Sequence, residues 1–531
     1  MPPPLDRREF LKRGLQACAI ASGAVTGAVA LAACDVGTTP SSTTSTTMST
    51  TALGPPTARD WRRLRDSLIG TLVLPSNPSY ATDRLLYNSK FVNPRPAAIA
   101  YCSSSDDAVR CIEFATKHSI EIVARSGGHS YGGYSTCSGL VVDVSRFNSV
   151  AVDTKANVAR VGAGARMIDV YNTIGGKGRL LPGGSCPTVG IAGLALGGGV
   201  GVFGRKFGLT CDNLRSMELV TAGGDRVSAN SNSHSDLLWA CRGGGGGNFG
   251  LATSFEFDVH PMPEVTLFSL EYPWGAAATV LEAWQHWSTL MPDEVWSSCH
   301  LYSQGTYGFS AQISGVFCGS PTALASLLAQ LRSGIDTPPS STFVGSDEYI
   351  NAMKIEAGCS ELSIASCHLP TDNRLGVLSR EAYSAKSSYL DAPTTSAHAA
   401  LLVHAVEALK DEAPTVGGGL TFDAYGGAIN RVKGDDTAFV HRDKLACIQA
   451  TYSWSSFTPP TEVAAGQRWL TWVGSDVFDP HTGAYQNYID PTLADWKTAY
   501  YGTNLERLTK VKRTYDPENR FAFAQSIPLG L

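Results

Sequence analysis

Apolar positions near the start of the folded sequence recur every three or four residues. Trp61, Leu64 and Leu68 follow this spacing and residues 107–119 repeat it, so two amphipathic helices are predicted there. Short β-favouring runs follow, which predict a hairpin over residues 217–228 and strands at residues 122–125, 140–144 and 158–161. Helices and strands interleaved at this density indicate an α+β fold.

Longer elements are predicted after the proline-rich segment His260-Pro-Met-Pro263, which marks a domain boundary. Residues 309–317 alternate apolar with small or polar positions, which is typical of a half-exposed strand. Helical spacing and further strand-like runs predict helices at 281–290, 323–331, 399–409 and 463–473, and strands at 420–425 and 447–454. Antiparallel strands backed by helices would form a substrate-binding domain over residues 264–484. The tail, residues 485–531, is expected to form one or two helices closed by a turn.

The first 57 residues carry export signals rather than the pattern of a packed domain. Arg7 and Arg8 precede Phe-Leu-Lys, and an Ala/Gly-rich stretch leads to Leu31-Ala-Ala-Cys34, which matches a lipoprotein cleavage box. Residues 1–34 are therefore predicted to be a twin-arginine lipoprotein signal that leaves the protein anchored through Cys34 at the cell surface or in the periplasm, or otherwise secreted. The alternative is an uncleaved membrane helix, although this stretch is only weakly hydrophobic. Residues 35–57, rich in Ser and Thr, are predicted to be a flexible linker.

Composition and charge exclude several classes of protein. The chain of 531 residues is 43% hydrophobic and 17% charged, which excludes a largely disordered protein, and its net charge of −5 excludes a basic nucleic-acid-binding surface. Its 13 cysteines show no paired C-x-x-C or metal-ligand spacing, so no metal site is predicted. Cys359 and Cys367 could close a loop disulfide in an oxidising compartment, with buried thiols as the alternative.

Three glycine-rich segments in the first half of the chain predict a large cofactor held mainly by main chain. The first, Arg125-Ser-Gly-Gly-His129-Ser-Tyr-Gly-Gly133, follows a predicted strand, and its glycines let backbone amides approach an anion. The second, residues 183–213, holds more glycine than a packed helix or strand is expected to tolerate, and the third spans residues 239–250. Such main-chain surfaces suit an elongated ligand that carries phosphate.

The order of these segments resembles the berberine bridge enzyme-like FAD-linked oxidases. The resemblance rests on the RSGGHS turn, the CPTVG-x-x-G-x-x-x-GGG-x-G run, the RGGGGGNFG turn and Asn487-Tyr488, and it extends from residue 58 to the end. It implies a two-domain PCMH-type fold of the vanillyl-alcohol oxidase type, with an FAD-binding domain at residues 58–263 that residues 485–531 complete. The FAD-binding residues that it implies are Arg125, Ser126, Gly127, Gly128, His129, Ser130, Gly133, Cys186, Thr188, Val189, Gly190, Gly193, Gly198, Gly199, Gly201, Asn248 and Asn487.

Two nucleophiles in these loops, the imidazole of His129 and the thiol of Cys186, are not needed to hold phosphate. In the resembled family the corresponding residues bond the 8α-methyl group and carbon C6 of the flavin, so the resemblance implies bicovalent FAD. Such links raise the flavin's potential and hold it beside an open cleft, which suits bulky substrates such as oligosaccharides or glycosylated aromatics. Val189 matches a position where valine accompanies oxidases and leucine accompanies dehydrogenases, which implies O₂ as the acceptor.

Oxidation of an alcohol needs a base for the hydroxyl proton. Tyr488 matches the family tyrosine whose phenolate is this base, and Gln449 stands where ring-forming members carry a catalytic glutamate, which favours alcohol oxidation. Because a free phenol has a pKa near 10, nearby cations or hydrogen bonds are expected to stabilise the phenolate. Tyr131, Tyr425 and Gln449 are the candidates for this hydrogen-bonding shell, with ordinary core or surface positions as the alternative for the two tyrosines.

The sequence therefore predicts an FAD-dependent oxidase. It would convert a secondary alcohol or hemiacetal of a sugar, oligosaccharide or aromatic natural product to a carbonyl or lactone, with O₂ as acceptor and H₂O₂ as product. The alternatives are a flavin dehydrogenase with another acceptor and a non-catalytic, lipid-anchored carbohydrate-binding protein. An enolpyruvyl-sugar reductase is disfavoured by the export signal and by the two attachment residues.

Overall fold

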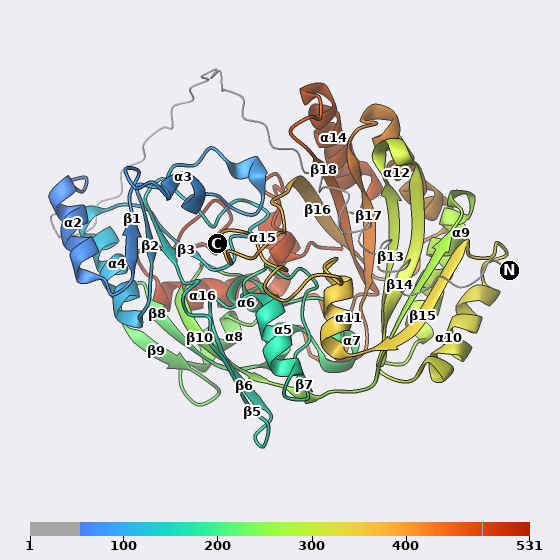
Figure 1. Cartoon of the computed structure of the whole chain (residues 1–531), viewed down its shortest axis with the longest axis horizontal. Coiled ribbons are helices and arrows are strands. Elements are labelled where there is room, and N and C mark those ends of the chain that lie inside the picture. Colours follow the sequence, from blue (N-terminus) through green and yellow to red (C-terminus); the bar gives the residue numbers. More distant parts are fainter. Residues whose placement is uncertain (1–53, 480–481, 531) are drawn as a thin grey trace.

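Two packed parts make up the computed structural model, which describes residues 54–479 and 482–530 (Figure 1). The N-terminal part, blue to green in Figure 1, contains two main sheets, and the part coloured yellow to orange contains one large sheet flanked by helices. The predicted export signal and nearly all of the linker lie outside the described residues. Within these residues, no helix combines the length and the apolar character that a membrane span requires.

The first sheet is built around three parallel strands. Its order is β1 (Thr71–Val73), β2 (Ala98–Tyr101), β4 (Leu140–Asp143) and β3 (Ile122–Arg125), with β1 antiparallel to β2. Every residue of β4 is buried, as expected for a strand covered on both faces. The strands predicted at residues 122–125 and 140–144 are confirmed.

Two helices pack against each other and against this sheet, one on β1 and the other on β4 (Figure 1). They are α2 (Ala58–Ser67) and α4 (Ser105–His118), and they confirm the two helices predicted from apolar spacing. Both begin at a hydroxyl cap, because the side chains of Thr57 and Ser104 each accept a hydrogen bond from a backbone amide of the first turn.

The second sheet has five antiparallel strands. Their order is β5 (Val150–Asp153), β6 (Val158–Gly162), β10 (Gly250–Asp258), β8 (Leu214–Thr221) and β9 (Arg226–Ala229). The predicted hairpin is confirmed as β8 and β9, and the strand at residues 158–161 is confirmed as β6. The sequence patterns did not predict β10, because it continues directly from a glycine-rich segment with no turn residues between them.

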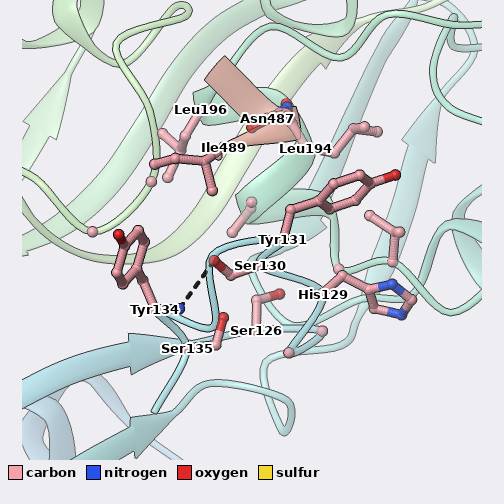
Figure 2. Close-up of a pocket in the computed structure, with 18 of the residues that line it drawn as sticks. Ser126, His129, Ser130, Tyr131, Tyr134, Ser135, Leu194, Leu196, Asn487 and Ile489 are labelled. Carbon is pink, nitrogen blue, oxygen red and sulfur yellow. Dashed lines mark hydrogen bonds between the residues drawn. The ribbon is translucent and has the colours of Figure 1, made fainter. Parts of the chain in front are cut away.

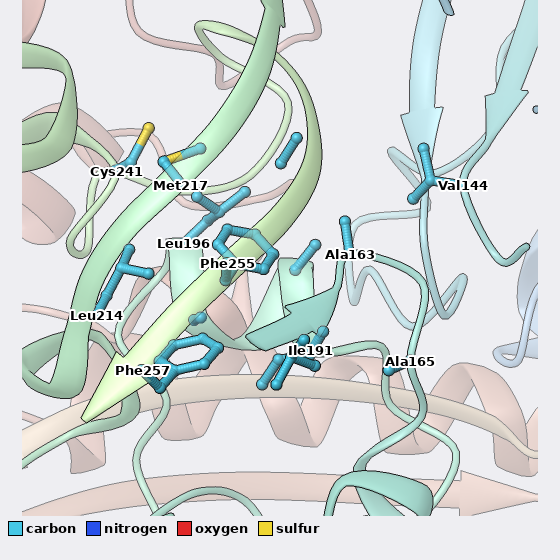
Figure 3. Close-up of a cluster of buried hydrophobic side chains, with 14 of the residues drawn as sticks. Val144, Ala163, Ala165, Ile191, Leu196, Leu214, Met217, Cys241, Phe255 and Phe257 are labelled. Atoms are coloured by element: carbon cyan, nitrogen blue, oxygen red, sulfur yellow. The ribbon is translucent and has the colours of Figure 1, made fainter. Parts of the chain in front are cut away.

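A short helix corrects the prediction that residues 183–213 are too rich in glycine to hold packed structure. Helix α6 (Ile191–Leu196) lies inside this segment and buries Ile191 and Leu196 in a core that also contains Phe255 and Phe257 of β10 (Figure 3). The apolar residues between the glycines thus anchor the segment, while its glycines remain free to approach other backbone. The shorter elements of this part are α3 (Tyr80–Asp83), α5 (Met167–Gly175), α7 (Gly204–Phe207), α8 (Ser235–Ala240) and the strand pair β7 (Arg179–Leu180) and β11 (His260–Pro261).

The large sheet is antiparallel throughout and has seven strands. In sheet order they are β15 (Ser341–Asp347), β12 (Val265–Tyr272), β14 (Phe309–Phe317), β13 (Val295–Ser303), β17 (Gly417–Ala424), β18 (Ala446–Trp454) and β16 (Ala382–Leu390). The predicted strand at residues 309–317 exists, but the prediction that it is half-exposed is wrong. It is an interior strand with six of its nine residues buried, and Phe309, Ser310 and Ser314 are only partly exposed.

The two faces of this sheet differ in chemistry. One face packs its apolar side chains against α9 (Ala277–Leu290), α10 (Pro321–Ser333), α12 (Ser396–Glu412) and α14 (Pro460–Trp472), which confirm the four helices predicted there. The opposite face faces the N-terminal part and carries the alternate residues of β13, β17 and β18, which are mostly polar. Two shorter helices of the C-terminal half contact the N-terminal part: α11 (Tyr349–Glu356) packs on α5, and α13 (Ala428–Arg431) packs on α7.

The C-terminal tail returns to the N-terminal part, with α15 (Trp496–Tyr501) and α16 (Leu505–Tyr515) contributing to its core. Lys512 on α16 is fully buried, where its ammonium donates hydrogen bonds to the carboxylate of Asp516 and to the carbonyls of Asn248 and Phe521. Lys512 thereby ties the tail to the third glycine-rich segment. The helices predicted between residues 495 and 515 are confirmed.

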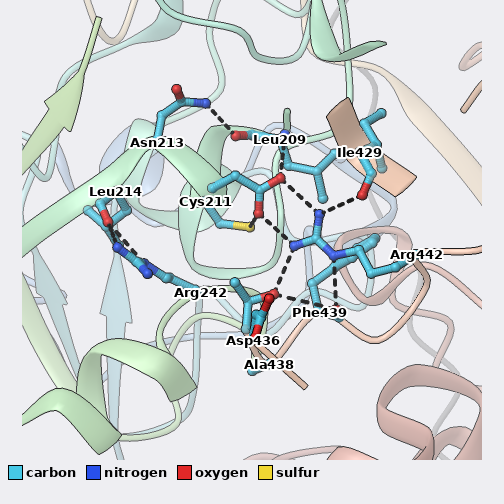
Figure 4. Close-up of polar contacts among 12 residues, drawn as sticks. Leu209, Cys211, Asn213, Leu214, Arg242, Ile429, Asp436, Ala438, Phe439 and Arg442 are labelled. Atoms are coloured by element: carbon cyan, nitrogen blue, oxygen red, sulfur yellow. Dashed lines mark hydrogen bonds and ion pairs between the residues drawn. The ribbon is translucent and has the colours of Figure 1, made fainter. Parts of the chain in front are cut away.

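Two ion pairs join the C-terminal half of the chain to the N-terminal part, one of them at the second glycine-rich segment. The guanidinium of Arg442 binds both carboxylate oxygens of Asp212, at 2.6 and 2.8 Å, and also contacts carbonyl oxygens around it (Figure 4). Arg166 binds Asp372 in the same bidentate manner. Asp372 follows a loop in which Cys359 and Cys367 form a disulfide, which decides between the two alternatives for these cysteines.

Candidate active site

One cavity of about 390 Å³ lies between the three glycine-rich segments, the large sheet and the tail. Figure 2 shows His129 and Tyr131 projecting from the first segment, with Leu194 and Leu196 of α6 and Asn487 and Ile489 of the tail around them. Twelve of the predicted cofactor-binding residues line this cavity, namely Arg125, Ser126, Gly127, Gly128, His129, Ser130, Cys186, Val189, Gly190, Gly193, Gly201 and Asn487.

The five other predicted cofactor-binding residues, Gly133, Thr188, Gly198, Gly199 and Asn248, do not line the cavity. The amide of Gly199 donates to the hydroxyl of Tyr485, and the side-chain amide of Asn248 donates to carbonyls of its own segment. These two residues stabilise the conformation of the loops and do not contact the cavity. Their distinction from cavity-lining glycines depends on how the loops stack, which the sequence does not reveal.

The first segment turns sharply as soon as β3 ends, which brings His129 to the cavity. Gly128 has a φ of +70°, a conformation that costs a side-chain-bearing residue energy. The ring of Tyr87 stacks on the imidazole at 4.0 Å between centroids, and Nε2 lies 2.9 Å from the hydroxyl of Thr188. Burial and the nearby charge of Arg166 lower the pKa of His129 to about 3, so its imidazole is neutral at physiological pH.

The second segment brings Cys186 into the same cavity. Its sulfur lies 3.8 Å from the hydroxyl of Thr188, so this hydroxyl is shared by the thiol and by His129. Burial raises the pKa of Cys186 to about 11, although hydrogen bonds from Thr188 and from the amide of Val189 act in the opposite direction. Sequence reasoning did not identify Tyr87, because nothing in its local sequence marks it as a partner of His129.

Of the predicted catalytic residues, Tyr488, Gln449 and Tyr131 line the cavity and Tyr425 does not. The rings of Tyr131 and Tyr488 stack at 5.1 Å, and the amide of Gln449 donates to the hydroxyl of Tyr131 at 3.1 Å. Tyr425 is 1% exposed and packs edge-on against Tyr389 within a buried aromatic cluster. Tyr488 packs against this same cluster, so the assignment of Tyr425 to the hydrogen-bonding shell stays a prediction, although Tyr425 does not line the cavity.

The surroundings of Tyr488 also differ from expectation. Burial raises its pKa well above the ordinary value, and the neighbouring Tyr131 and Asp423 raise it further. Among the residues that the structure describes, none donates a hydrogen bond to the Tyr488 hydroxyl, and the amide of Gln449 donates to Tyr131 instead. The expected stabilisation of a phenolate by cations or hydrogen bonds is thus absent from the described part of the chain.

Asp423 is the functional candidate that sequence reasoning missed. It lies on the polar face of β17, lines the cavity, and accepts a hydrogen bond of 2.6 Å from the hydroxyl of Ser298 on β13. Burial raises the pKa of Asp423 to about 6, and the pKa of the neighbouring Glu356 is raised to about 7 by burial and by the charge of Asp423. A single aspartate on a strand gives no local signal, because only the sheet register brings it beside Tyr488.

The polar face continues beyond Asp423. The hydroxyls of Tyr302 and Thr421 lie 2.7 Å apart, and Nδ1 of His300 lies 3.4 Å from Thr421. Burial lowers the pKa of His300 to about 4, which keeps this histidine neutral. The face thus offers neutral hydrogen-bonding groups, and no cluster within residues 54–479 and 482–530 has the makeup of a metal site.

The chain matches two family models, a FAD binding domain over residues 96–230 and the berberine and berberine like domain over residues 484–528. It is 32% identical to the FAD-linked oxidoreductase YgaK of Bacillus subtilis, over 87% of this chain and 98% of that protein. The chain belongs to the berberine bridge enzyme-like family of FAD-linked oxidoreductases. The wild-type structure of Physcomitrella patens BBE-like 1 is 30% identical, with a TM-score of 0.79 over 89% of this chain and 99% of that one. The xylooligosaccharide oxidase of Thermothelomyces thermophilus is 28% identical over 85% of this chain and 91% of that protein.

Membership of the berberine bridge enzyme-like family confirms the predicted fold class and makes the chain an FAD-dependent oxidoreductase. The residues present fit FAD. A Cβ atom built on Gly193 would meet nothing within 4 Å, and those on Gly246 and Gly247 would meet only atoms beyond 3.6 Å, so this backbone is open to the cavity. Arg125 also lines the cavity, and Nη1 of this buried side chain has no hydrogen-bond partner among the described residues, which suits contact with an anionic group.

Proposed function

We propose that this berberine bridge enzyme-like protein is an oxidase with bicovalently attached FAD. It oxidises a secondary alcohol or hemiacetal of a sugar, oligosaccharide or aromatic natural product to a carbonyl or lactone, and O₂ accepts the electrons and becomes H₂O₂. The observation that carries the proposal is the convergence of His129, Cys186, Tyr488 and Asp423 on one cavity. When bound, FAD supplies the hydride acceptor, and the side chains supply attachment, orientation and proton removal.

Attachment through both His129 and Cys186 is supported by their chemistry and their positions. Both face the cavity, and both are nucleophiles with hydrogen-bond partners that fix their orientation. A neutral imidazole has a lone pair available for bond formation. A tethered cofactor remains in place when a cleft is wide enough for a large substrate, and a relative with the name xylooligosaccharide oxidase supports a substrate of this kind.

Proton removal by Tyr488 and Asp423 together agrees better with their environment than removal by a free phenolate. A buried tyrosine with a strongly raised pKa is almost entirely protonated at neutral pH, whereas a carboxyl group with a pKa of about 6 is mostly ionised. We therefore propose that the Tyr488 hydroxyl forms the hydrogen bond to the substrate hydroxyl. The proton that leaves the substrate is finally accepted by the Asp423 carboxylate. Gln449 orients the aromatic pair through its hydrogen bond to Tyr131.

The test is the release of H₂O₂ from a substrate panel. Cellobiose, xylobiose, diacetylchitobiose, glucose and coniferyl alcohol are each mixed with aerobic enzyme, and peroxide and flavin bleaching are followed. Oxidation of at least one compound with stoichiometric H₂O₂ is expected. Flavin reduction that is followed by slow reoxidation in air, but fast reoxidation by a quinone, would instead identify a dehydrogenase.

The export signal at residues 1–34 forms a separate part of the proposal. We propose twin-arginine export followed by lipidation of Cys34, because paired arginines and a cleavage box stand in the required order. Arg7→Lys with Arg8→Lys should leave folded precursor in the cytoplasm, and Cys34→Ala should abolish labelling by a lipid precursor. Normal export of the double lysine variant would overturn the twin-arginine assignment.

A further inference from the structure

One hydroxyl group lies between the two proposed attachment residues. The Oγ1 atom of Thr188 is 2.9 Å from Nε2 of His129 and 3.8 Å from Sγ of Cys186, and the residue is 1% exposed. No other side chain in the described part of the chain forms hydrogen bonds with both nucleophiles. The Thr188 hydroxyl can therefore interact with His129 and with Cys186 at the same time.

Backbone contacts hold this hydroxyl in place. The first turn of α5 donates from the amides of Met167 and Ile168 to the carbonyls of Val189 and Pro187, the two neighbours of Thr188 in the chain. The ring of Tyr87 stacks on His129 from the other side and restricts rotation of the imidazole. Thr188 thus sits on a rigid turn and faces a ring that is itself fixed.

The Thr188 hydroxyl can donate only one hydrogen bond, and this limits what it can do for His129 and for Cys186. A threonine hydroxyl has one proton to donate and lone pairs with which to accept. When it donates toward the sulfur of Cys186, it must accept from Nε2–H of His129, and this leaves the lone pair of His129 on Nδ1. One orientation of a single hydroxyl therefore stabilises the thiolate form of Cys186 and selects the His129 tautomer that is nucleophilic at Nδ1.

We propose that Thr188 is the shared positioning residue for covalent attachment of FAD to both His129 and Cys186. The inference rests on the bicovalent attachment in the proposed function and extends it to the residue that controls both bonds. Formation of each covalent bond to FAD is a two-electron oxidation, and O₂ is the oxidant. Each attachment replaces an N–H or S–H bond and one flavin C–H bond by an N–C or S–C bond, and the two protons and two electrons released convert O₂ to H₂O₂.

The ionisation of the two nucleophiles agrees with this role. Burial raises the pKa of the Cys186 thiol to about 11, and the hydrogen bonds from the hydroxyl and amide of Thr188 lower it from what burial alone would give. Removal of the hydroxyl should therefore reduce the thiolate population further. His129 is neutral in either case, so for this residue the hydroxyl sets the tautomer and orientation and leaves the charge unchanged.

The test compares Thr188→Ser with Thr188→Ala, because both variants lose the methyl group and only serine keeps the hydroxyl. The purified full chains are denatured and digested, and mass spectrometry measures the fraction of the His129 peptide and of the Cys186 peptide that carries FAD. The alanine variant should show about tenfold less attachment at both peptides, the effect of one lost hydrogen bond in the attachment step, and the serine variant should match wild type. Thr188→Val, which preserves the shape of the side chain, should behave as the alanine variant does.

Thr136→Val is the matched control. The hydroxyl of Thr136 is buried near the first segment and has no hydrogen-bond partner among the described residues, so its loss should leave attachment at both peptides unchanged. Equal attachment in Thr188→Ala and Thr188→Ser would overturn the proposal, and so would a loss confined to one peptide. Wild-type protein without covalent FAD would overturn bicovalent attachment itself, an outcome that the unmodified peptides of the wild type distinguish from failure of the Thr188 proposal alone.

Discussion

The two walls of the cavity are built by different means. The wall from the glycine-rich segments is made largely of backbone, and the segments touch so closely that a Cβ atom on Gly190 would lie 2.1 Å from the hydroxyl oxygen of Ser126. The opposite wall is made of side chains, among them Asp423 and Gln449, that project from strands of the large sheet. Backbone holds the cofactor side, and side chains define the substrate side.

The backbone wall and the side-chain wall should therefore respond differently to substitution, the first through the fold and the second through substrate specificity. Substitution of a closely packed glycine moves two chain segments at once, whereas substitution on a strand face changes one functional group and leaves the ladder hydrogen bonds intact. We infer that the sheet face is the part of this protein that sets which alcohol is oxidised.

The largest effect is expected on the cofactor wall from removal of both nucleophiles. His129→Ala and Cys186→Ala should each keep FAD in an acid-precipitated pellet, because one covalent bond remains. The double variant should release all of its flavin, and absorbance of the supernatant near 450 nm measures the loss. A colourless pellet from wild type would show that neither bond forms.

On the substrate wall, loss of the proton-accepting groups should reduce rate without loss of flavin. Tyr488→Phe and Asp423→Asn should each slow anaerobic flavin reduction by about 10²- to 10⁴-fold, or roughly 3 to 5 kcal/mol, the range for removal of a general base. Stopped-flow absorbance with the panel compound that reduces the enzyme fastest measures this rate. Gln449→Ala should lose less, since its amide positions Tyr131 and carries no proton.

The pH dependence of the flavin-reduction rate shows whether Asp423 or Tyr488 finally accepts the substrate proton. Because Asp423 must be ionised to accept a proton, the wild-type rate should rise with pH through about 6 and then level, and Asp423→Asn should lose this limb. Ser298→Ala removes a hydrogen bond that stabilises the carboxylate, so the limb should move to higher pH. A wild-type limb at pH well above 10 that Asp423→Asn retains would assign the proton to Tyr488 alone.

Alanine substitutions at Gly190 and Gly193 compare a closely packed glycine with one that has free space around its Cα atom. Gly190→Ala should lower stability by about 1 to 3 kcal/mol, because its Cβ meets Ser126 and the backbone of Gly127. Gly193→Ala on α6 meets nothing within 4 Å and should leave stability equal or higher while it narrows the cavity. Urea unfolding and FAD content measure the two effects, and equal destabilisation by both changes would contradict the two-wall description.

The smallest effect is expected from one added methylene beside the proposed site of O₂ access. Val189 lines the cavity three residues after Cys186. Val189→Leu should slow reoxidation of reduced enzyme by O₂ about tenfold, because the extra methylene occupies space through which O₂ is proposed to reach the flavin. Flavin reduction by substrate should remain close to wild type. Stopped-flow mixing of reduced enzyme with oxygenated buffer measures this, and equal slowing of both half-reactions would indicate general damage.

The sequence by itself determined the cofactor wall, because its signals are contiguous. A strand that runs into RSGGHS, a glycine-rich run that starts at Cys186 and a third glycine turn each specify a local backbone path, and helical spacing located most of the flanking helices. The prediction failed at α6, where apolar residues between glycines pack into a core that the local sequence does not show. The sequence also could not show that Tyr425, one of 19 tyrosines, is buried away from the cavity, because composition does not distinguish them.

Only the tertiary structure decided the substrate wall. Asp423, Ser298 and Gln449 come from three strands, and the register of antiparallel pairs far apart in the chain brings them together. The same long-range packing determined that Thr188 lies between His129 and Cys186, and that burial raises the pKa of Tyr488 and Asp423. Backbone conformation follows from neighbours in the sequence, whereas electrostatic environment follows from neighbours in space, and the chemistry of this site depends on the latter.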